Sequence, residues 1–283
     1  MRINHNISSY NTQRQLTFNN TQQGKSLEKL SSGYRINRAA DDAAGLAISE
    51  KMRNQIRGLE QASKNALDGI SLIQTAEGAL NETHAMLQRM AELYVQGANE
   101  VLTTQDAAKI DSEVKQLSAQ IGSIAEQTQF NTKKLLNGDT TGVLFQVGAN
   151  SGETISLSLE TATATQLSVE FSTTGLQELK GATTAMGSMN SIAKANLSLV
   201  QAAINTVSGM RSDLGAVQNR LEHTINNLGT TSENLQAAES RIRDVDMAKE
   251  MSEFTKNNIL QQAATAMLAQ ANQQPQGVLQ LLR

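Results

Sequence analysis

The sequence predicts a mainly α-helical protein: a long, coiled-coil-like helical rod with paired N- and C-terminal helices and a short β-hairpin region. Apolar residues recur at alternating spacings of three and four over long stretches, which is the period of helices that pack along one another. Composition agrees, because aromatic residues make up only 3% of the chain and Pro275 is its single proline. A core built on large rings is therefore not expected.

The two ends of the chain predict amphipathic helices with incomplete cores. Isolated helices of modest length are marginal in water, so we expect the ends to pack on each other and on an outside partner. The chain contains 23 Asn and 27 Gln, whose amides can hydrogen-bond across a packed surface without the desolvation cost of a charge. The scattered apolar positions are Ile3, Ile7, Leu16, Leu27 and Leu30 at one end and Ile242, Val245, Met251, Phe254, Leu260, Met267, Leu268, Val278, Leu281 and Leu282 at the other.

Three apolar stripes between the ends predict the rod. The first runs from Leu59 to Val101 and the second from Ala107 to Ile124, where Thr103 to Asp106 offer N-cap side chains. The third runs from Ala193 to Leu228. At about 1.5 Å per residue the longest spans roughly 60 Å. We expect one bundle that closes late, because the third stripe lies far along the chain from the others.

The segment from about Asn137 to Gly181 has a different pattern. Asn137-Gly138-Asp139 and Asn150-Ser151-Gly152 are turn signals, and the residues that follow them alternate with period two. This is typical of a β-hairpin that packs on the rod rather than of a separate domain. The alternating apolar positions are Val143, Phe145, Val147, Ile155, Leu157 and Leu159, followed by Leu167, Val169 and Phe171.

Charge and residue types exclude several functions. The formal net charge is −3, so no large positive field exists to hold nucleic acid, and no apolar run approaches the roughly 18 residues of a membrane span. Without cysteine there is no thiolate metal site, disulfide or cysteine nucleophile. The N-terminus has no apolar segment typical of a signal peptide, so a protein that leaves the cell needs another route.

The polar residues do not form a catalytic or metal-binding pattern. His5, His84 and His223 share no ligand spacing, so we expect no metal and no cofactor. Asp41 and Asp42 are adjacent, and neighbours on a helix point about 100° apart. We interpret them as residues of a helix start rather than as an acid/base pair.

Four strings near the ends and in the rod resemble bacterial flagellins. They are the segment KSLEKLSSGYRINRAADDAAGLAI at 25–48, QTQFN at 127–131, AESRIRDVDMA at 238–248 and MLAQAN at 267–272. The resemblance covers about 1–137 and 188–283. It implies a non-enzymatic, extracellular subunit that polymerises with copies of itself into the flagellar filament and is exported unfolded by the flagellar type III system.

The resemblance also implies a division of the chain and a set of partners. Residues 1–42 and 238–283 would form the inner terminal-helix domain, 43–137 and 188–237 the rod, and 138–187 the hairpin excursion. The partners would be other copies, an export chaperone at the C-terminal helix, and the filament cap and hook-filament junction proteins. Nucleic-acid binding and membrane insertion are not expected.

One stretch of the rod resembles the flagellin segment that the flagellin-sensing Toll-like receptor of animals recognises. Arg89 and Leu93 match two of its contact residues and Glu113 a third. Family members usually have a second arginine where this chain has Ala91 and a small residue where it has Tyr94. We expect the lost charge and the added ring, on one turn of the helix, to alter subunit packing and receptor response. The alternative is that Arg89 and Leu93 serve only the subunit interface.

The sequence disfavours two rival functions. A hook-filament junction protein has flagellin-like ends, but the agreement continues through the rod, including Gln127 to Asn131. A secreted enzyme on a flagellin scaffold would need ligand triads and a longer insert than 138–187 provides.

Overall fold

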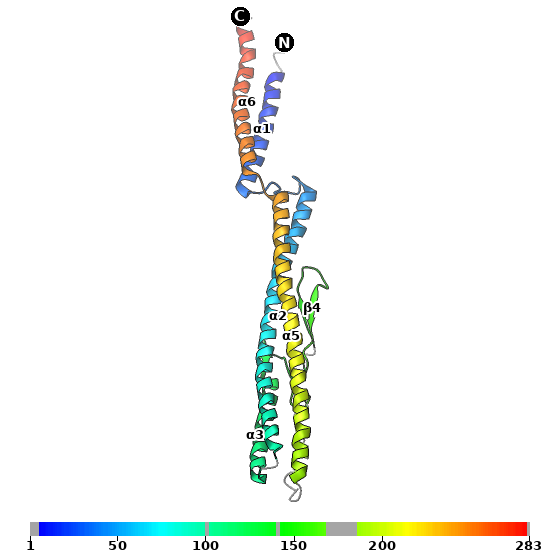
Figure 1. The fold of residues 1–283 in the computed structure, drawn as a ribbon. Coiled ribbons are helices and arrows are strands. Elements are labelled where there is room, and N and C mark those ends of the chain that lie inside the picture. The colour runs from blue at the N-terminus through cyan, green and yellow to red at the C-terminus, as the bar shows by residue number, and fades with distance from the viewer. Residues whose placement is uncertain (1–5, 100–101, 140–141, 168–185, 282–283) are drawn as a thin grey trace. The chain divides into compact units, whose positions relative to one another are not determined.

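The computed structural model describes residues 6–99, 102–139, 142–167 and 186–281. The chain divides into two compact units, one made of Met1–Ile56 with Ser232–Arg283 and the other of Arg57–Thr231. Both boundaries fall inside long helices. The helices are α1 (Ile7–Ser32), α2 (Ala43–Gly97), α3 (Thr104–Gln127), α5 (Met186–Arg243) and α6 (Met247–Leu281), and the strands are β1 (Gln129–Phe130), β2 (Lys133–Lys134), β3 (Val143–Gln146) and β4 (Thr154–Leu157) (Figure 1).

Local side chains explain where the terminal helices begin and end. The Asn6 side chain accepts a hydrogen bond from the Ser9 amide at the start of α1. Gly33 ends that helix in the left-handed conformation, at φ 74°, with its N–H bonded to the Lys29 carbonyl. At the start of α2, the Asp42 carboxylate accepts from the Gly45 amide at 2.8 Å. The prediction that this carboxylate starts a helix is confirmed.

In the first unit, α1 and α6 lie side by side and antiparallel (Figure 1). At one end of the pair, the Asn6 amide donates to the Ala271 carbonyl at 2.7 Å. At the other end, Lys29 forms an ion pair with Glu250 at 3.8 Å. The prediction that the two chain ends form paired helices is confirmed.

In the second unit, α2, α3, α5 and the hairpin share one hydrophobic core. The predicted stripes supply most of this core: along each stripe buried and half-buried positions alternate, except at Ala107, which is half-buried like its neighbour Ile110. Val101 lies outside the described residues. Among the fully buried side chains are Ile73, Leu80 and Leu87 of α2, Val114 and Ile121 of α3, and Val200, Val207 and Leu221 of α5.

The hairpin forms as predicted and packs on α2. Strands β3 and β4 are antiparallel, with Phe145 opposite Ile155, and both of these side chains face the core. Two glycines of α2 make room for it: a Cβ on Gly58 would lie 2.8 Å from the Ala149 Cβ, and one on Gly69 would lie 3.2 Å from the Phe145 ring. Leu167 is buried, whereas Val169 and Phe171 lie outside the described residues.

Two features surround α3. Thr103 and Asp106 form a capping box, in which each side chain bonds the other residue's backbone N–H, as the N-cap prediction required. Beyond the helix, β1 and β2 pair across Asn131 and Thr132, both at positive φ. This two-residue ribbon was not predicted.

Hydroxyl groups on the helices mostly bond their own backbone. Thr17 donates to the Gln13 carbonyl at 3.0 Å, and Thr255 donates to the Met251 carbonyl at 2.9 Å. The same i to i−4 bond recurs at Thr21, Ser71, Thr75, Thr83, Ser123, Thr206, Thr224, Thr230 and Ser252. Within the described part of the chain, no helix is long and apolar enough to cross a membrane.

Candidate functional site

The fully buried positions of α1 and α6 are largely polar, whereas Leu16, Leu30, Phe254 and Leu268 are half-buried. The buried residues of α1 are Asn19 and Ser26, and those of α6 are Glu250 and Ala271. Hydrogen bonds join the two helices at their far end, where the Ser9 hydroxyl donates to the Asn272 side-chain carbonyl at 2.8 Å. The interface thus uses the neutral polar side chains that the composition indicated.

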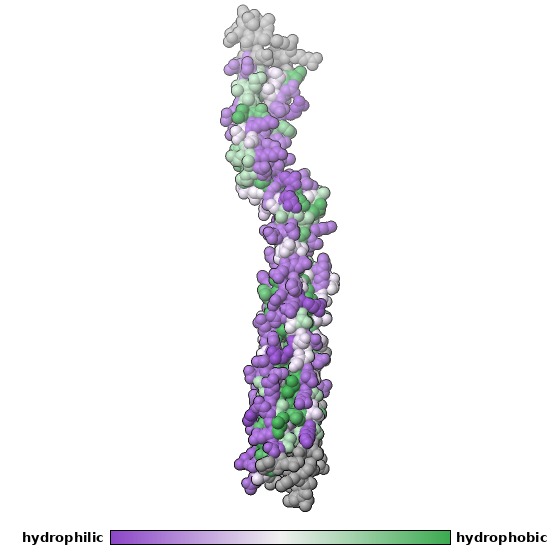
Figure 2. All heavy atoms as spheres, viewed as in Figure 1, coloured by the Kyte–Doolittle hydropathy of each residue, from purple (hydrophilic) through white to green (hydrophobic). Residues whose placement is uncertain are grey.

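Large apolar side chains lie instead on the outside of this pair. Figure 2 shows them interspersed with polar groups on the surface. A shallow, open groove along the surface of α6 is bordered by Met251, Ile259 and Leu260 together with Thr255 and Lys256. The exposed apolar side chains are Ile7, Tyr10, Phe18 and Leu27 of α1 and Met247, Met251, Ile259, Leu260 and Met267 of α6. The pair therefore presents the kind of surface that proteins bury against partners.

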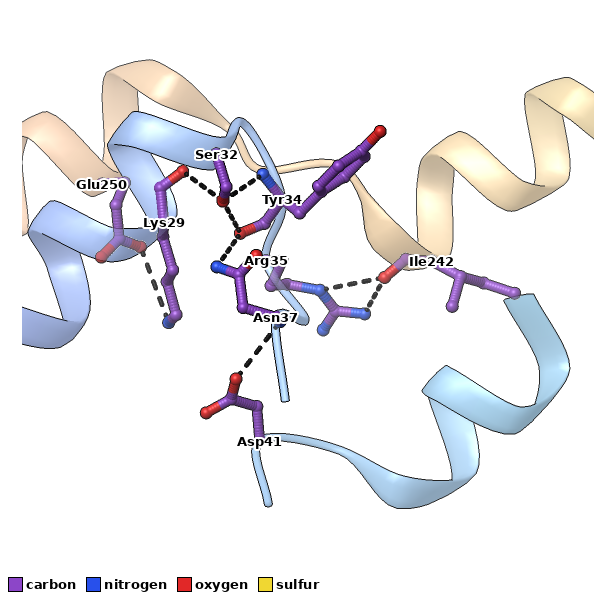
Figure 3. Close-up of polar contacts among 8 residues, drawn as sticks. All are labelled: Lys29, Ser32, Tyr34, Arg35, Asn37, Asp41, Ile242 and Glu250. Carbon is purple, nitrogen blue, oxygen red and sulfur yellow. Dashed lines mark hydrogen bonds and ion pairs between the residues drawn. The ribbon is translucent and has the colours of Figure 1, made fainter. Parts of the chain in front are cut away.

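A short backbone crossing ties the two linkers of the first unit together, and we call it the linker clasp. Tyr34 and Asp244 form an isolated antiparallel bridge. The Arg35 amide donates to the Arg243 carbonyl at 2.7 Å, and the Val245 amide donates to the Gly33 carbonyl at 3.0 Å. The Arg35 guanidinium also donates to the Ile242 carbonyl at 2.6 Å, which satisfies a carbonyl at the end of α5 (Figure 3).

Side chains of α2 and α5 extend the clasp with ion pairs. The Arg243 guanidinium lies 4.8 Å from the centre of the Tyr34 ring and donates to Glu50 at 2.7 Å. Arg53 pairs with Glu239 at 3.0 Å. Stacking on a ring and pairing with a carboxylate both hold an arginine in one orientation.

A carboxylate turn completes the linker that enters α2. The Asp41 carboxylate accepts from the backbone amide of Arg38 at 3.0 Å. It also accepts from the backbone amide of Asn37 at 3.2 Å (Figure 3). These bonds favour the ionised form, so the pKa of Asp41 is lowered, with the Arg38 amide as the largest cause. Asp41 therefore has a structural role, and no acid/base partner lies beside it among the contacts described.

The predicted receptor residues lie where α2 faces α3. Arg89 pairs with Glu113 at 3.0 Å and with Glu92 at 3.1 Å, and these hydrogen bonds, Glu92 first, raise the pKa of Arg89. About half of the Arg89 and Glu113 side-chain surface is exposed. Leu93 is only 2% exposed, so its side chain offers no surface to a partner in this conformation. The structure brings Arg89 and Glu113 together and puts Leu93 beneath them.

Tyr94 requires a correction. The sequence places Tyr94 on the apolar stripe and also led us to expect its ring to add bulk on the receptor-facing turn with Ala91, but the ring is buried in the core and adds no bulk to that surface. Burial, and secondarily the nearby Asp111 charge, raises the pKa of the Tyr94 phenol. Tyr94 belongs to the apolar stripe that includes Leu87, and this face of α2 is buried in the core.

No group of three or more His, Asp or Glu side chains lies close enough to hold a metal ion within the described ranges. His84 is half-buried, and its Nε2 bonds the Gln88 amide at 3.0 Å.

Comparison with known proteins gives consistent results. Residues 3–141 match the bacterial flagellin N-terminal helical region, and residues 197–282 match the bacterial flagellin C-terminal helical region. A flagellin of Bacillus subtilis is 56% identical and one of Halalkalibacterium halodurans is 58% identical, each over the full length of both chains. The chain belongs to the bacterial flagellin family. It is a short flagellin, without a large outer domain.

The family decides the broad function. Flagellins are structural proteins that self-assemble into the extracellular flagellar filament, so this flagellin is a filament subunit and not an enzyme. A solved structure from Vibrio parahaemolyticus, described as a flagellar hook-associated protein, is 15% identical, with a TM-score of 0.61 over 72% of this chain and all of that one. At that identity the likeness concerns the fold alone.

The linker clasp was missed by sequence reasoning. Its residues lie within the strings SSGYRIN and SRIRDVD, which carried the flagellin resemblance, but nothing in either string indicates that they bind each other. The signal available was the pair of arginines, Arg35 and Arg243, each beside a predicted helix end.

Proposed function

We propose that this flagellin polymerises through the outer faces of α1 and α6, which copies of the chain bury against one another. In this proposal residues 1–42 and 238–283 form the inner layer of the filament. Residues 43–137 and 188–237 form the surrounding rod layer, with 138–187 as an excursion on it.

One observation carries the proposal: large apolar side chains lie exposed on the outside of the terminal pair, although polar side chains such as Asn19 and Ser26 are buried within it. Ile259 is 61% exposed and Tyr10 is 70% exposed, although both are large apolar side chains. Each one removed from water contributes about 1.5–3 kcal/mol, which is a strong drive for association when several are buried together. Heterologous contacts of this kind that do not close give an open helical polymer.

The test is seeded polymerisation of purified monomer with Ile259→Asp. A charge buried in the interface must be desolvated, so we expect the critical concentration to rise on the order of 100-fold, equivalent to about 2.7 kcal/mol. Ser198→Asp, at an exposed site of α5 in the second unit, is the matched control. Unchanged filament formation by Ile259→Asp would overturn the assignment of this surface.

We also infer how the chain is exported and which other flagellar proteins bind it. The chain travels unfolded through the flagellar type III channel, an export chaperone covers the apolar face of α6 beforehand, and the filament cap and junction proteins bind the same terminal pair. The absence of cysteine supports such transit, because no disulfide can form on the way. Chaperone binding to α6 is tested by co-purification: the chaperone should co-purify with the wild-type chain but not with a chain that ends at Arg243.

A second proposal concerns recognition of the monomer by the animal flagellin-sensing Toll-like receptor. Arg89 and Glu113 form the exposed charged contact, and Leu93 supports it from beneath by fixing α2. In the filament this face is covered by neighbouring subunits, so only monomer is recognised.

Binding of the receptor ectodomain to monomer tests this recognition. Arg89→Ala should weaken receptor binding by about 1–3 kcal/mol if the residue is an interface anchor. Glu113→Gln should also weaken binding, because it removes the charge that pairs with Arg89. Leu93→Met keeps the core volume and serves as the folded control. Ala91→Arg should strengthen binding, because it adds a donor on the exposed turn. Unchanged affinity on losing Arg89 would leave that residue with a packing role only.

A further inference from the structure

The methionines of the chain differ sharply in exposure. Seven of them have described side chains, and the three most exposed all lie on α6: Met247 at 49%, Met251 at 49% and Met267 at 55%. Met90 and Met210 are buried in the rod core, at 0% and 8%. Met52 and Met86 are half-buried. Among the described methionines, solvent exposure is thus concentrated on one helix.

Accessible thioethers react with peroxides. The sulfur lone pair attacks one oxygen of hydrogen peroxide, so that an S–O bond forms as the O–O bond breaks. The departing hydroxide takes the proton from the oxygen now bonded to sulfur and leaves as water. The sulfur is oxidised by two electrons and the peroxide is reduced. The product, methionine sulfoxide, is polar and chiral where the thioether was apolar and flexible.

The surroundings of these sulfurs give the reaction a consequence. Met251 borders the groove on α6 with Ile259 and Leu260, so a sulfoxide there would place a strong dipole in an apolar patch. A polar group without a hydrogen-bond partner is costly to bury. The Thr255 hydroxyl beside it already donates to the Met251 carbonyl and is not free to pair with the new oxygen.

We propose that Met247, Met251 and Met267 form an oxidation site that controls assembly. Peroxide converts them to sulfoxides in the unassembled chain, the outer face of α6 is then more costly to bury between copies, and the critical concentration for polymerisation rises while the second unit stays folded. An enzyme of the methionine sulfoxide reductase class restores the thioethers and with them the ability to polymerise. This inference rests on the proposed burial of that face in the filament.

The experiment treats purified monomer with increasing hydrogen peroxide and follows each methionine by peptide mass spectrometry. We expect Met247, Met251 and Met267 to react on the order of tenfold faster than Met90 and Met210, which are internal standards of the same chemistry. The far-ultraviolet circular dichroism of the rod should stay unchanged, and the critical concentration for seeded assembly should rise on the order of tenfold. Reductase treatment should reverse that rise. Equal reaction rates at all five sites would overturn the inference.

Variants separate this inference from the assembly surface itself. The triple variant Met247→Leu, Met251→Leu and Met267→Leu keeps the apolar volume and should polymerise after peroxide treatment, whereas Met90→Leu should remain sensitive. Loss of assembly by the treated triple variant would assign the effect elsewhere and overturn the inference. If untreated Ile259→Asp polymerises normally, the proposed surface fails. If Ile259→Asp is blocked but fully oxidised wild type polymerises, only the oxidation site fails.

Discussion

The two compact units of the chain are built on opposite plans. In the second unit, Arg57–Thr231, which we call the rod unit, Leu80, Val207 and Leu221 are buried with their neighbours and the polar side chains face outward. In the terminal pair, Asn19 and Ser26 are inside, whereas Phe18 and Ile259 face outward. Both use the helical period of three and four. The difference is which side chains occupy the inward positions.

This contrast indicates where each unit obtains its stability. Burial of apolar surface is the main favourable term in folding, so the rod unit has a core of its own. The terminal pair has hydrogen bonds and one half-buried ion pair inside, and each typically adds only about 1 kcal/mol net. Its larger gain becomes available when its outer face meets other subunits.

The largest expected effect comes from placing a charge in the rod core. Leu214 is nearly fully buried in α5, so Leu214→Asp loses packing and buries an unpaired carboxylate. The cost is several kcal/mol, about 4 or more, against a total stability of about 5–15 kcal/mol. Thermal unfolding of the monomer followed by circular dichroism should show a collapse of the transition. An unchanged melt would refute the core assignment, and Asp213→Asn, next to it, should be near neutral.

Amide exchange of the free monomer should separate the two units directly. We expect the opening free energy of amides in α1 and α6 to be at least about 2 kcal/mol below that of residues 200–221, because few apolar contacts hold the pair. Assembly into filaments should raise protection in α1 and α6 far more than in the rod. Equal protection in a verified monomer would show that the terminal pair is stable alone.

A smaller effect is expected at the linker clasp. Tyr34→Ala removes the ring under Arg243 and should destabilise the first unit by about 1 kcal/mol, the scale of an exposed cation–π contact. Tyr34→Phe keeps the ring and is the matched control. The melting of the first unit measures both. If the two variants behave alike, the stacking contributes nothing.

An effect of similar size, confined to one helix end, is expected at the N-terminus of α3. Thr103→Ala should cost about 1 kcal/mol because it removes an N-cap. Hydrogen bonds from the Thr103 hydroxyl, then its backbone amide, lower the pKa of Asp106 below its ordinary value of 3.8. Ionised Asp106 therefore stabilises the helix above that value, and the contribution is lost as the pH falls through the lowered pKa.

Exchange protection of the first turn of α3, compared between wild type and Asp106→Asn, checks the pH dependence. The difference should be constant above about pH 4 and vanish in stronger acid. A difference that persists well below the lowered pKa would contradict the role of the carboxylate.

Most of the fold could be predicted from local pattern. The stripes that place Ile121 and Leu214 inside the core, the cap at Thr103 and the hairpin turns at Gly138 and Gly152 all follow from short-range rules. These rules hold because the helices are long and pack along one another. The ends of the helices were predicted less accurately: α3 ends at Gln127, three residues beyond the expected Ile124.

What the pattern could not predict depends on contacts between distant residues. The bridge between Tyr34 and Asp244 joins positions more than 200 residues apart. Leu93 lies one step off the predicted stripe, but α2 packs against both α3 and α5, which widens its buried face beyond a single stripe. A sequence shows the period of a helix and not the number of its neighbours.

The hydroxyls that bond their own helix have a consequence for hydration. On α1 and α6, Thr17, Thr21, Ser252 and Thr255 already direct their protons to backbone carbonyls. Such groups retain fewer oriented waters that a neighbouring chain must displace. Release of ordinary apolar hydration water then dominates the thermodynamics of association, and that process is driven by entropy near room temperature and weakens on cooling. A filament built this way should be held together more firmly in warm water than in cold.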